Sequence, residues 1–98
     1  MTRHACRKDI NHNPIEQIFR TMLADHVTDT SKFGAGAGDL FVSFGTYACF
    51  VEIKSGDKKE LTPDQVRFQR THPHNWHRVN SDAEAIELCK LIRSLVTR

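Results

Sequence analysis

Two carboxylates and a lysine have the residue types and spacing of a hydrolytic metal site. Asp39 begins one apolar run, Glu52 lies near the end of the next, and Lys54 follows two residues later. Only Gly45-Thr46 separates the two runs, and glycine first in a two-residue loop predicts a type II′ hairpin. With this even loop length, Asp39 faces Glu52 across the hairpin, and Lys54 projects from the same face.

Directly opposed like charges destabilise a hairpin, so this pair calls for a counter-charge. Mg²⁺ and Mn²⁺ favour oxygen ligands, and Mg²⁺ commonly joins one or two protein carboxylates to a substrate phosphate. A cation there would activate water and hold a phosphate oxygen, while Lys54 would stabilise charge developing on phosphorus. The residues therefore indicate metal-assisted phosphodiester hydrolysis. The alternative is ordinary: Asp39 caps a turn, and Glu52 and Lys54 form a solvated ion pair.

Three helices are predicted around this hairpin from their starting signals. Asn13-Pro14-Ile15-Glu16 predicts a first helix, with Asn13 as cap and Glu16 completing a capping box. Thr62 to Gln65 predicts a second helix that ends at His72-Pro73-His74, and Ser81 to Glu84 predicts a third.

The hairpin is apolar on both faces, which predicts helices packed on both sides of the sheet. Residues 76–79 predict a short strand parallel to 47–54, reached through a helical crossover. Residues 27–33 are compatible with a short edge strand. The expected element order is α-β-β-β-α-β-α, an α/β fold in which Cys49 and Cys89 belong to the core.

The 98 residues predict one domain over 13–98, preceded by a basic arm over 1–12 that lacks periodicity and is either disordered or an extended arm. The sequence shows no apolar run long enough for a membrane span and no signal peptide. Three widely spaced cysteines favour a reducing compartment, so a cytoplasmic protein is expected. The net charge of +2 permits nucleic-acid binding without requiring it.

An ordered set of motifs resembles a known nuclease family. Gly38-Asp39, the strand Val51-Glu52-Ile53-Lys54 and the helix start Leu61-Thr62-Pro63-Asp64-Gln65 are similar to the virus-type replication-repair nuclease (VRR-NUC) domains of the PD-(D/E)XK superfamily. The resemblance runs from about Asn13 to Ala85, and it is strongest to the stand-alone, phage-associated branch. One departure is Gly38, where the motif has proline; this is expected to affect loop stiffness more than chemistry.

The resemblance implies a restriction-endonuclease-like αβββαβ core with a mixed sheet, followed by a C-terminal helix. It also implies site roles: Asp39, Glu52 and the Ile53 backbone carbonyl would bind Mg²⁺ or Mn²⁺, and Lys54 would be the catalytic lysine. Glu16 matches the family's first-helix glutamate, and Gln65 matches its glutamine near the active site. Both residues also have capping roles open to them.

Basic residues near these motifs are candidates for DNA contact, because cations that neutralise phosphates give sequence-independent affinity. A merely solvated basic surface is the alternative. A zinc site among His72, His74 and His77 is disfavoured, because no Cys-x-x-Cys accompanies them. The candidate DNA-binding residues are Lys32, Lys58, Lys59, Arg67 and Arg70.

The expected function is a metal-dependent endonuclease acting on branched DNA such as four-way junctions, in the host cytoplasm if the gene is phage-encoded. One active site per small chain predicts a homodimer, since cutting two strands needs two sites. Two alternatives stay open: a non-catalytic DNA-binding or assembly module that keeps the fold, and a nuclease subunit that needs a partner chain.

Overall fold

The structure is a computed structural model that describes residues 10–23, 26–34, 36–56 and 60–96. Within these residues, three helices and four strands follow one another in the expected α-β-β-β-α-β-α order. Their bounds are α1 His12–Met22, β1 His26–Asp29, β2 Leu40–Phe44, β3 Tyr47–Ile53, α2 Pro63–Thr71, β4 Trp76–Val79 and α3 Asp82–Leu95.

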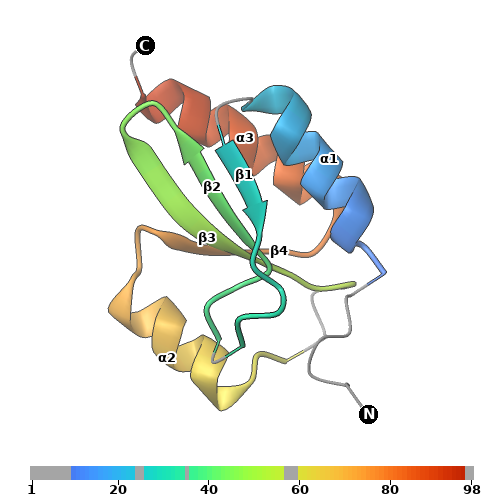
Figure 1. Cartoon of the computed structure of the whole chain (residues 1–98), viewed down its shortest axis with the longest axis vertical. Helices are drawn as coiled ribbons and strands as arrows, with labels where there is room; N and C mark the ends of the chain where they lie inside the picture. The colour runs from blue at the N-terminus through green and yellow to red at the C-terminus, as the bar shows by residue number, and fades with distance from the viewer. Residues whose placement is uncertain (1–9, 24–25, 35, 57–59, 97–98) are drawn as a thin grey trace.

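The four strands form one mixed sheet in the order β1-β2-β3-β4 (Figure 1). β1 and β2 pair antiparallel, as do β2 and β3, while β4 runs parallel to β3. The parallel pair is joined through α2, as a crossover connection requires. The edge strand and the parallel fourth strand are both confirmed, although β1 is shorter than the predicted segment and begins one residue earlier.

The two faces of the sheet are covered by different helices. α1 and α3 pack together on one face, and α2 lies on the other (Figure 1). The face under α1 and α3 carries the main core. On the opposite face, Phe50 of β3 packs edge-on against Phe68 of α2, with their ring centroids 5.9 Å apart. The core residues are Ile15, Phe19, Leu23, Val27, Leu40, Val42, Phe44, Cys49, Val51, Ile53, Val79, Ala85, Cys89 and Ile92.

The start of α1 differs from the prediction. The helix begins at His12 rather than after Asn13, and Asn11 occupies the cap position without a side-chain cap bond. Glu16 is therefore the fifth helical residue, too far along to complete a capping box. Its capping role was therefore wrongly predicted.

The Asn11 side chain bonds to distant strand ends rather than capping the helix, which explains why α1 starts before the predicted residue. Its side-chain amide donates to the carbonyl of Lys54 at 3.2 Å and to the carbonyl of Asn80 at 3.1 Å. These bonds tie the start of α1 to the ends of β3 and β4. A long-range pair of hydrogen bonds thus outweighs the local capping preference.

The other two helix starts agree with their signals. Thr62 accepts the Gln65 N–H, and the Gln65 side chain accepts the Thr62 N–H, which is the full capping box. Ser81 caps α3 by accepting the Glu84 N–H, but the Glu84 carboxylate accepts from Asn80, one residue before the cap. In the part of the chain that is described, no helix is long and apolar enough to cross a bilayer.

Candidate active site

The hairpin that carries the site has the predicted register. Gly45 has a φ of 61°, a value that suits glycine, and Phe44 pairs with Tyr47 across the turn. The pairing continues without interruption to Leu40 opposite Val51. The even loop length on which the site prediction depended is confirmed.

The regular pairing of β2 with β3 does not extend to Asp39. The ladder ends at Leu40 and Val51, and the Asp39 N–H also donates to the Val51 carbonyl at 2.8 Å. The strand therefore bends, and the strict opposition of Asp39 to Glu52 was wrong. The bend nonetheless keeps the carboxylate at β3, because Asp39 Oδ2 accepts the Ile53 N–H at 2.8 Å.

Gly38 makes this bend possible. Its φ of 124° lies where side chains are strained, and an added Cβ would lie 3.1 Å from the Val51 carbonyl oxygen and 3.3 Å from Phe50 Cβ. Proline, with φ fixed near −65°, cannot adopt this conformation. The backbone path into Asp39 therefore suits glycine at position 38.

Glu52 is an acidic side chain held in a buried position. It is 5% exposed, and burial raises its pKa to about 7 from an ordinary 4.5. The nearby Asp39 raises the pKa further by its charge and by a side-chain hydrogen bond, while Lys54 partly offsets both effects. Asp39 and Glu52 are therefore close together, and bringing a cation to them would relieve an electrostatic penalty.

Lys54 stands beside this pair in a fixed position. Its Nζ is 3.5 Å from Glu52 Oε2, and the side chain is largely buried. Its backbone N–H donates to the Val79 carbonyl at 3.0 Å, and its carbonyl accepts from Asn11. The lysine is thus anchored at the common end of β3, β4 and α1. Ile53, the third proposed metal ligand, lies between Glu52 and Lys54 at the end of β3.

Glu16 takes part in a different cluster. Its Oε1 lies 3.1 Å from His12 Nε2, and its Oε2 accepts from Arg20 at 2.7 Å. His12 Nε2 is also 3.5 Å from Asp29 Oδ2. Asp29 pairs with Leu40, whose side chain lies in the core under α1 and α3, so this cluster is on the opposite sheet face from Phe41 and Phe50.

Gln65 belongs to the N-terminus of α2, over the second sheet face. Its Oε1 is occupied by the capping bond from Thr62. Gly36 of the glycine loop packs against the Asp64–Gln65 peptide so closely that an added Cβ would lie 2.5 Å from it. The start of α2 and the loop leading to Asp39 are thereby held together, which places Gln65 near that loop.

The cationic candidates that the structure describes lie at the surface. Lys32 is exposed in the turn after β1, and Arg70 is exposed in the last turn of α2. Arg67 is also exposed, and it pairs with Asp64 at 2.7 Å. Lys58 and Lys59 lie outside the described residues.

The three histidines after α2 serve separate structural roles. His72 stacks on Phe68, the His74 carbonyl accepts from the Tyr47 hydroxyl, and His77 Nε2 lies 2.8 Å from that hydroxyl. Burial lowers the pKa of His77. Within the described ranges they form no metal-holding group.

The structure aligns Arg78, a residue outside the predicted site, with Glu52. The two residues are partners in the parallel pairing of β3 with β4 and share a face. The Arg78 guanidinium donates to the carbonyl of Gly56 at 3.0 Å and to Asn80 Oδ1 at 2.6 Å. No local signal reveals this alignment, because the crossover through α2 sets the parallel register.

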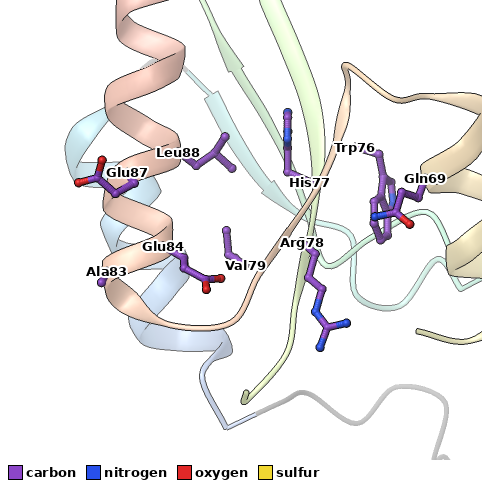
Figure 2. Close-up of a pocket in the computed structure, with 9 residues that line it drawn as sticks. All are labelled: Gln69, Trp76, His77, Arg78, Val79, Ala83, Glu84, Glu87 and Leu88. Atoms are coloured by element: carbon purple, nitrogen blue, oxygen red, sulfur yellow. The ribbon is translucent and has the colours of Figure 1, made fainter. Parts of the chain in front are cut away.

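Arg78 also borders an open groove of about 510 Å³ along β4. Figure 2 shows Leu88 and Glu84 of α3 on one side of β4, with Trp76 beside Gln69 of α2 on the other. The groove follows β4 and does not include Asp39, Glu52 or Lys54.

Comparisons with known proteins add no assignment to this geometry. No family model matches the chain, and no curated protein matches it.

Proposed function

We propose that the chain is a divalent-metal-dependent endonuclease that hydrolyses DNA phosphodiesters, with Asp39, Glu52 and Lys54 as its active centre. The observation that carries the proposal is the convergence of these three side chains at one end of the sheet, together with the raised pKa of Glu52. A buried carboxyl perturbed by a second carboxylate is costly to keep, and such perturbation is typical of functional sites.

The residues present suit Mg²⁺ or Mn²⁺. Two carboxylates are oxygen ligands of the kind these ions prefer. Glu52 lies within β3, and Asp39, just before β2, is held to β3 by the Ile53 N–H. The Ile53 carbonyl is the proposed third protein ligand. When bound, the ion would supply an activated water and charge compensation for a phosphate oxygen.

The protein's own side chains have distinct tasks in this proposal. The Ile53 N–H donates to Asp39 Oδ2 and fixes the side-chain conformation, so the other carboxylate oxygen, Oδ1, is already oriented. Glu52, whose pKa is raised to about 7, would bind the ion in its ionised form. Lys54 supplies a fixed positive charge for the phosphate as negative charge develops on it.

The substrate side of the proposal rests on surface charge. Arg67 and Arg70 lie on α2, and α2 covers the sheet face that carries Phe50. With Lys32, they are proposed to contact DNA phosphates, and Lys58 and Lys59 are proposed to extend these contacts. Branched DNA is the proposed substrate and a homodimer the proposed assembly, since one chain presents one centre.

The test is cleavage of junction, flap and duplex DNA with Mg²⁺ or Mn²⁺. Asp39→Asn and Lys54→Ala should each lose at least about 100-fold in rate, in line with loss of electrostatic stabilisation of the reacting phosphate. Lys90→Ala is the matched control, because Lys90 forms an exposed ion pair with Glu87 on α3. Full cleavage activity in both Asp39→Asn and Lys54→Ala would refute the assignment of the active centre.

Two further outcomes would separate the alternative functions. Tight binding of branched DNA without cleavage under any divalent ion would favour a binding module. Cleavage that appears only when another protein is added would favour a subunit of a larger nuclease.

A further inference from the structure

We infer that His12, Glu16 and Asp29 form a second metal site, distinct from the proposed nuclease centre and selective for Zn²⁺-like transition ions. Within the described residues, these three are the group of metal-ligating side chains whose ligand atoms all lie within 4.8 Å of one another. They join the first turns of α1 to the end of β1. The site goes beyond the proposed function, because it uses a different sheet face and different ligand chemistry.

The two distances from His12 to the carboxylates suit tetrahedral coordination. His12 Nε2 is 3.1 Å from Glu16 Oε1 and 3.5 Å from Asp29 Oδ2. Zinc bonds of about 2.0–2.1 Å to nitrogen and oxygen place tetrahedral ligands about 3.3–3.4 Å apart. One nitrogen and two carboxylate oxygens would leave the fourth position to water.

The carboxylates are already oriented by their other oxygens. Glu16 Oε2 accepts from Arg20 Nε at 3.0 Å and from Arg20 Nη2 at 2.7 Å. Asp29 Oδ1 accepts from the Ser31 N–H at 2.9 Å and from the Ser31 hydroxyl at 2.6 Å. Supporting hydrogen bonds of this kind orient metal ligands, and here they direct Oε1 and Oδ2 toward His12.

The buried histidine faces this cluster through its Nε2 nitrogen. His12 is 0% exposed, and its Nδ1 has no hydrogen-bond partner in the described part of the chain. A single Nε2–H can point well at only one acceptor, yet two carboxylate oxygens approach that nitrogen. A cation in their midst would contact Nε2 and both carboxylate oxygens at once, and the ring proton would then lie on Nδ1.

The ligand set also separates this site from the nuclease centre. Imidazole suits Zn²⁺ and Co²⁺, whereas Mg²⁺ favours oxygen ligands with several retained waters. We therefore expect Zn²⁺ to bind at His12 and Mg²⁺ to prefer Asp39 and Glu52. A bound ion would link α1 to the edge strand β1 and stabilise the fold.

The experiment uses the full chain with Asp39→Asn and Glu52→Gln as the reference protein, so that the nuclease centre contributes no binding. The stripped protein is titrated with Co²⁺, whose visible spectrum reports tetrahedral ligation, and Zn²⁺ affinity follows by competition. One ion per chain and a rise in melting temperature with Zn²⁺ are expected. Adding Asp29→Asn or Glu16→Gln should weaken binding by more than about 100-fold, beyond the loss typical of a supporting residue.

His74→Gln is the matched control, since His74 is exposed and outside the cluster; binding should be unchanged. His12→Gln completes the set, and if it does not fold, Asp29→Asn decides the question. Circular dichroism without metal shows that each variant is folded. Zn²⁺ affinity unaffected by Asp29→Asn and Glu16→Gln would overturn the site. Because no DNA is involved, failure here is distinguishable from failure of the nuclease proposal.

Discussion

Replacing Glu52 by glutamine should stabilise the protein at neutral and alkaline pH, although it removes a central residue of the site. Glutamine keeps the size and polarity of the side chain but cannot ionise. In the folded chain, burial and Asp39 raise the pKa of Glu52 to about 7, against 4.5 in the absence of these effects. At about 1.4 kcal/mol per pH unit, the charged form costs the folded state up to about 3 kcal/mol.

The sign of the pH dependence follows from the two pKa values. Below about pH 4.5, Glu52 is protonated in both the folded and the unfolded chain, so it contributes no pH-dependent difference. Between pH 4.5 and 7 the unfolded chain ionises first, and the folded state loses stability as pH rises. Above pH 7 the loss is complete. The difference in unfolding free energy between Glu52→Gln and the wild type should therefore increase from pH 4.5 to pH 7.

The assay is urea unfolding at a series of pH values with a chelator present, so that no divalent ion relieves the repulsion. The unfolding free energies should agree near pH 4.5 and differ by up to about 3 kcal/mol at pH 8, or of the order of 10 °C in melting temperature. Glu87→Gln is the matched control, because the Glu87 side chain is 75% exposed; its gap should stay within about 0.5 kcal/mol. A Glu52→Gln gap that is constant with pH, or a less stable variant at pH 8, would refute the reasoning.

Three further predictions concern the scaffold. Gly36→Ala should cost at least about 2 kcal/mol more than Gly34→Ala, because both positions have positive φ (78° and 74°) but only Gly36 lies against backbone; equal costs in urea unfolding would contradict the close approach. Cys49 and Cys89 should react slowly with a thiol reagent until the chain unfolds, because burial raises their pKa values to about 12 and 11. Fast native labelling of either of these two cysteines, located by peptide mass spectrometry, would show that the core is open. Thr62→Ala should lower the unfolding free energy by about 1 kcal/mol through loss of the α2 cap, whereas Thr62→Ser should restore it; equal stabilities of the two variants would contradict the cap.

The sequence by itself determined the features that depend on neighbouring residues. Gly45-Thr46 set the hairpin register as far as Leu40 and Val51, because a two-residue loop allows little else. Thr62 with Gln65, and Ser81, marked two helix starts through hydrogen bonds only three residues long. Apolar residues on both faces of the hairpin predicted that helices would cover both sides, because each face must be buried.

Only the tertiary structure decided how these elements meet at the end of the sheet. Asn11 bonds to Lys54 and Asn80, residues far along the chain, and so moves the start of α1 away from Asn13. That shift leaves Glu16 without a capping role, in a position where it meets His12 and Arg20 of α1.

The remaining differences have the same cause. Gly38 bends the strand at Asp39, so the carboxylate reaches Ile53 while its backbone stays one residue short of Glu52. The crossover through α2 aligns Arg78 with Glu52. Contacts between residues far apart in sequence depend on packing and on strand register across connections, and neither is written in a local pattern of residue types.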